Sequence, residues 1–144
     1  MKIALSTDEW HPIHEFIQTW LKDKGHEILL YGSYKTHQDV SWVDSTISAA
    51  EAVSKGQCDQ AILCCWTGTG ASIAANKVKG IRAAVAENVR DAFLARKDDD
   101  VQVLCLSGRY TTFSQAKNII TTFITTPFED LAKRRRRLRE VRQM

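Results

Sequence analysis

Residues 60–77 read QAILCCWTGTGASIAANK, and the prediction of the fold starts from this stretch. Its first part, Gln60–Cys65, is an unbroken apolar run, which is typical of a strand covered on both faces in a parallel sheet. A Gly-rich turn at residues 67–70 follows directly and leads into a helical pattern over residues 71–77. We therefore expect a central strand that ends in a turn and opens a helix.

Strand and helix patterns alternate over the rest of the chain. Because strands that alternate with helices of this length form parallel sheets, we predict a doubly wound α/β sandwich, which binds ligands beyond the carboxyl ends of its strands. No linker or repeat divides the chain, so residues 1–144 are predicted to form one domain with a basic C-terminal helix from about residue 128. Strands are expected at 2–6, 26–31, 60–65, 81–86 and 101–106, and helices at 13–21, 44–55, 71–77, 88–96 and 114–123.

The composition is that of an ordinary globular protein, with 44% hydrophobic and 26% charged residues. No apolar run approaches the roughly 20 residues that span a bilayer. The sequence enters directly into the apolar residues after Lys2, without the zones of a signal peptide. We therefore expect a cytoplasmic protein with no membrane partner.

The four cysteines are expected to be free thiols, because they have no regular spacing. Adjacent Cys64 and Cys65 point to opposite faces of a strand, so they cannot converge on one zinc ion. The four histidines also lack the spacing of metal ligands, and we predict no metal site. Free thiols indicate a reducing compartment.

The net charge of +3 hides a basic C-terminus, in which seven of the last twelve residues are Lys or Arg. Such a tail can bind nucleic acid by releasing counterions, or it can form a solvated helix or a phosphate clamp. Interleaved aromatic residues are missing, which argues against nucleic acid as a partner. The basic residues are Lys133, Arg134, Arg135, Arg136, Arg137, Arg139 and Arg142.

The turn after Cys65 has the character of an anion site. Gly68 and Gly70 allow the backbone to approach a ligand closely, and the first free amides of the following helix favour negative charge. The turn lacks the full Rossmann spacing and the Gly-Lys-Ser/Thr of a nucleotide loop, so a plain connection between strand and helix is the alternative interpretation.

Cys65 ends the central strand at the mouth of this turn, where a helix N-terminus favours the thiolate. A thiolate in that place can take a proton from carbon, although Cys65 can also be a small buried apolar residue. Asp8 and Glu9 follow the first strand at the same edge, where carboxylates can exchange protons with sugar hydroxyls. Residues 98–100 are acidic as well and precede a strand, but they can equally be a solvated turn.

Together these segments resemble the family of type B ribose-5-phosphate isomerases and galactose-6-phosphate isomerases, over nearly the whole chain. The most specific match is residues 72–77, SIAANK, next to Cys65 and the Thr67-Gly68 pair. The resemblance implies a Rossmann-like three-layer α/β/α sandwich with a central parallel sheet of about five strands. It also implies a homodimer or homotetramer with sites shared between subunits, a sugar-phosphate substrate and no cofactor. Further matches are Gly32–Tyr34, Gly80–Ala84, Leu94–Arg96, Asp100, Val103–Leu106, Arg109 and Phe128–Glu129.

The resemblance also implies a reaction, in which an aldose–ketose isomerase works through a cis-enediolate. Cys65 would take the proton from the carbon next to the carbonyl and return it to the neighbouring carbon. Amides around Gly68, Thr69 and Gly70 would stabilise the enediolate oxygen, an effect of about 3–4 kcal/mol per donor. Thr67 and Asp8 would move the hydroxyl protons.

The sequence departs from the family pattern in the substrate-binding region. Glu9 replaces a phosphate-contacting histidine, and a carboxylate there would repel a phosphate. Asp98 and Asp99 replace a His-Asn pair that serves ring opening and substrate hydroxyls across the dimer, and an acid such as Asp98 can still open a ring. Trp66 replaces a glycine and should reshape the pocket, so the substrate can differ from ribose 5-phosphate.

The phosphate clamp is ambiguous, because the family uses two arginines one helical turn apart. Arg136 aligns with the second arginine, but Ala132 stands in place of the first. A shift of one residue pairs Lys133 with Arg137 on one helical face instead. A non-catalytic sugar-phosphate binding protein with the same fold is therefore the alternative to an isomerase.

Overall fold

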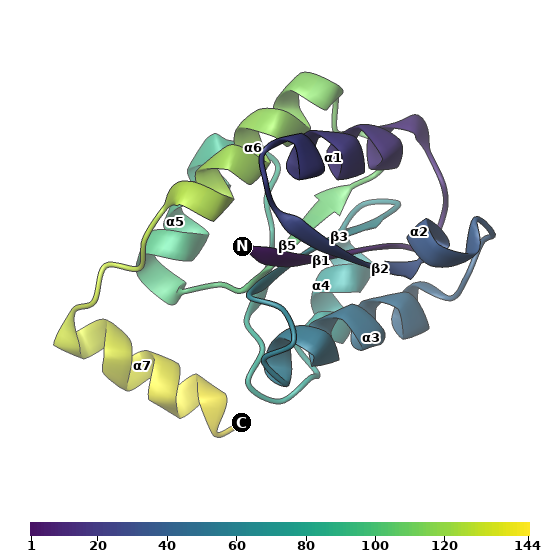
Figure 1. Cartoon of the computed structure of the whole chain (residues 1–144). Helices are drawn as coiled ribbons and strands as arrows, with labels where there is room; N and C mark the ends of the chain where they lie inside the picture. Colours follow the sequence, from purple (N-terminus) through teal and green to yellow (C-terminus); the bar gives the residue numbers. More distant parts are fainter.

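The computed structural model describes residues 1–144 and contains a sheet of five parallel strands in the order β2-β1-β3-β5-β4. The strand β3 lies at the centre and spans the residues predicted for it, and the doubly wound α/β fold is confirmed (Figure 1). The strand bounds are β1 Lys2–Thr7, β2 Glu27–Gly32, β3 Gln60–Cys65, β4 Ala83–Val85 and β5 Val103–Ser107.

Helices cover both faces of the sheet and complete three layers (Figure 1). On one face lie α1 Pro12–Asp23, α5 Val89–Asp99 and α6 Phe113–Thr125, and on the other lie α3 Trp42–Ser54 and α4 Thr69–Ala75. None of the helices has both the length and the apolar character needed to cross a bilayer.

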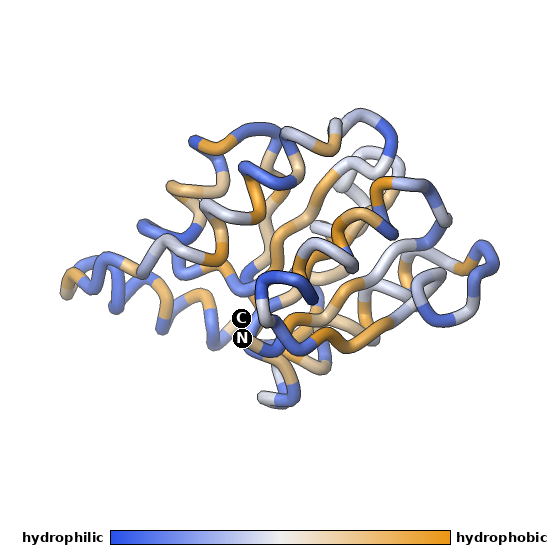
Figure 2. The backbone as a smooth tube through the Cα atoms, turned by 45° about the horizontal axis from the view of Figure 1, so that its top comes forward, coloured by the Kyte–Doolittle hydropathy of each residue, from blue (hydrophilic) through white to orange (hydrophobic).

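The central strand divides its side chains between two apolar cores. Ile62 and Cys64 pack into the core under α1, α5 and α6, whereas Leu63 and Cys65 belong to the core under α3 and α4. Cys64 and Cys65 therefore face opposite sides, as the period of a strand requires. Figure 2 shows apolar residues along the strands inside the sandwich and hydrophilic residues over most of the C-terminal helix.

Two strands begin two residues later than predicted, and one short helix was not expected. β4 begins at Ala83 instead of residue 81, since Arg82 N donates to the side-chain oxygen of Gln102 at 2.8 Å. β5 begins at Val103 instead of residue 101. The helix α2, Ser33–Thr36, follows β2, which ends at Gly32 with a φ of 59°.

The basic C-terminal helix, α7 Ala132–Arg142, begins four residues later than predicted, because the segment before it is tied to α5. Glu129 N donates to Lys97 O at 2.9 Å, and Leu131 N donates to Glu129 O at 2.9 Å. No residue of α7 is buried, and the helix packs chiefly against α5. Figure 1 shows α7 set apart from the sandwich, on the side where α5 ends.

Candidate active site

A cleft lies at the carboxyl edge of the sheet, where β1, β3 and β5 end. It brings together Asp8, Glu9 and Cys65, which were predicted to share this edge. Its free volume of about 20 Å³ leaves room for about one water molecule. The lining residues are Thr7, Asp8, Glu9, His11, His14, Cys65, Trp66, Gly108 and Arg109.

Cys65 closes the floor of this cleft. Its backbone oxygen accepts a hydrogen bond from Gly108 N at 2.9 Å, which fixes the end of β3 to the segment after β5. The residue is 8% exposed and lines the cleft, so the thiol lies at the border between the apolar core and the opening. A small ligand can therefore reach the sulfur from the cleft only.

The other three cysteines lie in the interior and form no disulfide. Burial raises the pKa of the thiols of Cys58, Cys64 and Cys105, so all three stay protonated near neutral pH. None of them lines the cleft at the carboxyl edge. Proton chemistry by a cysteine at this edge can therefore involve Cys65 alone.

The turn after Cys65 requires glycine for two separate reasons. Gly68 has a φ of 82°, and a Cβ on it would lie 3.1 Å from the Leu106 carbonyl carbon. A Cβ on Gly70 would lie 3.1 Å from the indole of Trp42, which packs against the turn. The turn thus brings the first amides of α4 beside the end of β3, as the sequence predicted.

Thr67 and Thr69 face a second opening and do not line the Cys65 cleft. They border a cavity of about 520 Å³ beside β4, together with Glu87, Tyr110 and Gln115. The Thr67 hydroxyl accepts a hydrogen bond from Thr69 N at 3.3 Å. Its own proton remains available for a ligand.

Trp66 and Arg109 form one wall of the Cys65 cleft. The Arg109 guanidinium lies 3.9 Å from the centre of the Trp66 indole, within the range of a cation–π contact. Ser107 Oγ donates to Trp66 O at 2.7 Å and ties the backbone to β5. The indole is 49% exposed and lines the cleft.

Asp8 and Glu9 form the opposite wall. Burial raises the pKa of Asp8, and the charges of neighbouring Glu9 and Asp39 add to that effect, against the influence of backbone hydrogen bonds. Asp8 O accepts a hydrogen bond from Val40 N at 3.0 Å, which fixes the loop. The Glu9 carboxylate has a partner, because its Oε2 lies 3.3 Å from His11 Nε2.

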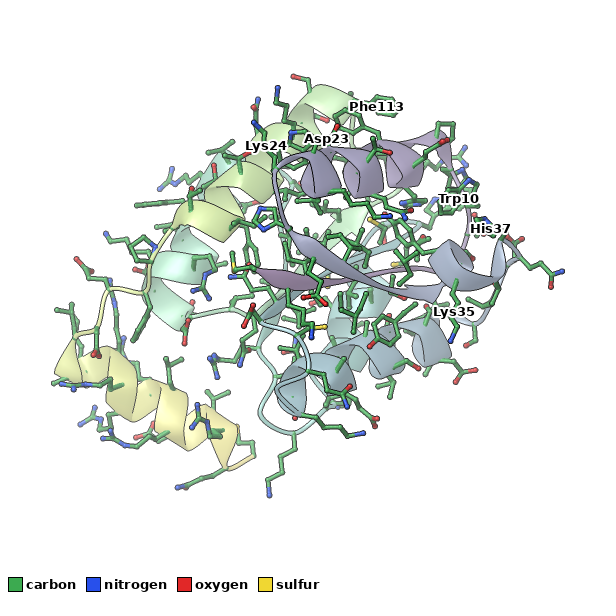
Figure 3. The ribbon with its side chains drawn as sticks, viewed as in Figure 1. Trp10, Asp23, Lys24, Lys35, His37 and Phe113 are labelled. Atoms are coloured by element: carbon green, nitrogen blue, oxygen red, sulfur yellow. The ribbon has the colours of Figure 1, made fainter.

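Aromatic packing holds this loop in place from outside. Trp10 packs edge-on against Tyr34 at 5.3 Å and against His37 at 5.4 Å between ring centres. Figure 3 shows Trp10 and His37 close together between α1 and α2. The loop that carries Asp8 and Glu9 is thus fixed by packing as well as by hydrogen bonds.

His14 lies fully buried beneath the cleft. Its Nε2 lies 3.2 Å from Thr7 Oγ1, and its Nδ1 has no partner. Burial, with a smaller contribution from the charge of His11, lowers the pKa of His14 to about 4. The imidazole is therefore neutral near pH 7. No group of three His, Cys, Asp or Glu side chains converges in a way that could hold a metal ion.

Five residues gather at the opposite, amino edge of the sheet. Asp98, Asp99, Lys133, Arg134 and Arg137 line a cavity of about 240 Å³ between the end of α5 and the start of α7. The Asp98 carboxylate lies 2.6 Å from Arg134 Nη2, and Arg134 also pairs with Glu129. Within one chain, these residues are therefore not brought to Cys65.

The residues of the expected phosphate clamp separate in the structure. Lys133 and Arg137 share the amino-edge cavity, as the shifted alignment requires. Arg136 lies outside this cavity, and its Nε is 3.7 Å from Glu140 on the exposed side of α7. Lys133 and Arg137, but not Arg136, therefore face a common cavity.

Known proteins share this fold. Residues 3–141 match the family model described as Ribose/Galactose Isomerase. The chain belongs to this family. It is 35% identical over 133 residues to galactose-6-phosphate isomerase subunit LacB of Clostridium acetobutylicum, an alignment that covers 90% of this chain and 75% of that protein.

Further members of the ribose/galactose isomerase family match over still more of the chain. Ribose-5-phosphate isomerase B of Mycobacterium tuberculosis is 32% identical over 139 residues, which cover 96% of this chain and 86% of that protein. The solved structure of ribose-5-phosphate isomerase B of Clostridium thermocellum superposes with a TM-score of 0.92 at 35% identity, and the match covers 99% of this chain and 96% of that chain.

Among the residues at the two edges that had no predicted role are His11, His14 and Arg134. His11 lies two residues beyond Glu9 after a strand, and that position was a usable signal. His14 follows one helical turn later and is hidden by burial. Arg134 stood among the basic residues of the tail, but nothing local in the sequence indicates its pairing with Asp98.

Proposed function

We propose that this chain is an aldose–ketose isomerase that acts on a sugar phosphate through a cis-enediolate, with Cys65 as the base. The observation that carries the proposal is the position of Cys65, at the end of the central strand, at the floor of a cleft and beside the glycine turn. The names of the related proteins, which are isomerases of ribose 5-phosphate and galactose 6-phosphate, support the class of reaction.

In the proposed reaction one proton moves between adjacent carbons. The Cys65 thiolate takes the proton from the carbon next to the carbonyl, and the electron pair moves to the carbonyl oxygen. Amides at Gly68, Thr69 and Gly70 hold the resulting oxyanion. The Cys65 thiol then returns the proton to the neighbouring carbon, while Asp8 exchanges the hydroxyl proton from within the cleft and Thr67 from the second opening beside β4.

We further propose that each site is completed by a second copy of the chain, in a homodimer or homotetramer. The Cys65 cleft alone holds about one water, which is too little for a sugar phosphate. Asp98, Asp99, Lys133 and Arg137 line a cavity at the far edge, beside a helix with no buried residue. In the assembly, the two aspartates would contact substrate hydroxyls and the two basic residues the phosphate.

The shared site has a direct test in mixed assemblies of two inactive variants. Co-expression of Cys65→Ser and Arg137→Ala chains in equal amounts, with different tags, produces dimers in which one site of each mixed pair is intact. Activity should return to about a quarter of that of the wild type, since half of the dimers are mixed and half of their sites work. No recovery in the mixture would contradict a shared site.

Isotope exchange tests the reaction itself. In deuterated water, the purified protein should incorporate deuterium into at least one member of a panel of tetrose, pentose and hexose phosphates. Cys65→Ala should abolish this exchange. Cys64→Ala, a change on the same strand but the opposite face, is the matched control and should keep the exchange. A wild-type protein that binds these sugars and exchanges no deuterium would instead be a sugar-phosphate binding protein. This second candidate is favoured by Trp66 in the cleft and by the carboxylates of Asp98 and Asp99 at the far edge.

We also propose that residues 1–144 work as one domain in the cytoplasm. The two edges are carried by one sheet and its helices, and the four cysteines are unpaired, which suits a reducing compartment.

A further inference from the structure

The cleft contains an imidazole–carboxylate pair that the proposed proton transfer does not use. His11 Nε2 lies 3.3 Å from Glu9 Oε2, and both residues line the cleft that also contains Cys65. Their side chains are 45% and 41% exposed, so both remain accessible to a ligand. Glu9 accepts a hydrogen bond from one ring nitrogen and thereby orients the imidazole, and the other nitrogen remains free to face a substrate.

A pentose or hexose phosphate needs such a group before Cys65 can act. These sugars exist mainly as closed rings, which lack the carbonyl that acidifies the neighbouring carbon. Ring opening breaks the bond between the anomeric carbon and the ring oxygen, and it forms the carbonyl. The anomeric hydroxyl loses a proton and the ring oxygen gains one, so a single group that accepts and then donates a proton suffices.

Asp98, the position where the family resemblance indicates ring opening, is poorly placed for this task in the present chain. Its carboxylate lies 2.6 Å from Arg134 Nη2, and Arg134 also holds Glu129. A carboxylate held by a guanidinium has an oxygen committed to that partner, and its remaining capacity is that of a hydrogen-bond acceptor. Asp98 is therefore suited to bind a hydroxyl.

The other groups around His11 are also unsuited to ring opening. His14 is buried and neutral, because burial and the charge of His11 lower its pKa to about 4. The Arg109 guanidinium is a fixed cation that stacks on Trp66. Asp8 is already assigned to the hydroxyl proton, and Cys65 to the carbon-bound proton. His11 is the remaining side chain in the cleft whose two ring nitrogens can accept a proton and donate one, and one of them faces Glu9.

We propose that His11, oriented by Glu9, is the acid–base group that opens the sugar ring at this site. The inference rests on the proposed isomerase function. It assigns Glu9 a positioning role in place of the simple repulsion of phosphate that the sequence suggested.

The test compares a sugar that forms a ring with one that cannot. D-ribose 5-phosphate closes a ring, whereas D-erythrose 4-phosphate cannot, because its C4 oxygen carries the phosphate. In the full-length assembled enzyme, His11→Gln should lower kcat/KM for ribose 5-phosphate by about 10²-fold. The same variant should change kcat/KM for erythrose 4-phosphate by less than about threefold, because no ring has to open. Glu9→Gln keeps an oxygen that faces His11 and should lose less than His11→Gln on ribose 5-phosphate.

His26→Gln, at the amino edge of the sheet, is the matched control and should leave both sugars unaffected. An equal loss on both sugars in His11→Gln would overturn the assignment of ring opening while the isomerase function stands. A wild-type enzyme that exchanges deuterium into neither sugar would overturn the proposed function, and this assignment with it.

Discussion

The two edges of the sheet differ in how many of their charged groups form ion pairs. At the carboxyl edge Asp8 and Arg109 form no ion pair, and the Arg109 guanidinium lies against the rings of Trp66 and Tyr110. At the amino edge Arg82 and Arg96 both pair with Asp100, and Arg134 pairs with Asp98 and Glu129. The first edge leaves Asp8 and Arg109 without an ion pair, whereas at the second edge Arg134 joins α7 to α5, and of the basic residues in its cavity Lys133 and Arg137 form no ion pair. Unpaired charge in a cleft is therefore the better indicator of chemistry in this fold.

The largest expected effect concerns the base at the carboxyl edge. Cys65→Ala should lower kcat by about 10²–10⁴-fold, since it removes the group that moves the proton. Steady-state kinetics on the best substrate of the deuterium panel measure this loss. Far-ultraviolet circular dichroism checks that the fold is intact. A variant that keeps more than about a tenth of the activity would show that proton transfer takes place elsewhere.

A second effect concerns the stability of the folded chain at acid pH, and it comes from His14 beneath the same cleft. His14 has a pKa of about 4 in the folded chain against 6.5 as its ordinary value, so the unfolded chain binds the proton more tightly. The stability that neutral His14 provides is complete above pH 6.5 and is lost as the pH falls toward 4, by up to about 3 kcal/mol.

Urea unfolding at pH 7.5 and pH 4.5 measures this effect, in the wild type and in His14→Gln. The wild type should lose about 2–3 kcal/mol more than the variant between these two values. The difference between the two proteins isolates His14, because Asp8, whose raised pKa acts with the opposite sign, is present in both. Equal losses in both proteins would contradict the burial of a neutral imidazole.

At the amino edge the expected effect is smaller and indirect. Arg134→Ala should release Asp98 and Glu129 and loosen α7 from α5. Loss of a charged hydrogen-bonded contact costs about 2 kcal/mol, so KM should rise by up to about thirtyfold, with less change in kcat, because Asp98 is proposed to contact the substrate. Arg135→Ala removes a neighbouring ion pair with exposed Asp130 and serves as the control. A fall in kcat with constant KM would place Arg134 in the chemistry instead.

The smallest expected effect concerns Trp66, which lines the cleft at the carboxyl edge. Trp66→Gly removes the indole from the cleft and should raise kcat/KM for a hexose phosphate, relative to a tetrose phosphate, by about tenfold. Trp66→Phe keeps an aromatic ring under Arg109 and should shift this ratio less. An unchanged ratio in Trp66→Gly would mean that the indole does not limit the length of the substrate.

The sequence predicted the central part of the fold because its signals are local. The bounds of β3 follow from one apolar run, and the conformation of Gly68 follows from the turn that the next helix needs. The positions of Asp8 and Cys65 at one edge follow from parallel strands. Each of these inferences needs only the residues within one strand–turn–helix unit.

The features that the sequence did not predict depend on contacts between segments that are distant in the sequence. The start of α7 is set by hydrogen bonds between Glu129 and Lys97, and no periodicity indicates them. The pairing of Arg134 with Asp98 is equally remote. The placement of Asp98 away from Cys65 could have been predicted from the sequence, because residues that precede a parallel strand lie at the amino edge of the sheet.

The separate position of α7 has a consequence for the behaviour of the protein in dilute solution. A helix with no buried residue contributes little to its own chain and much to whichever neighbour it covers. Under the proposed sharing of sites, turnover per chain rises with protein concentration and falls toward zero where the assembly dissociates. Enzyme assays at nanomolar concentration would then report the strength of association as much as the chemistry.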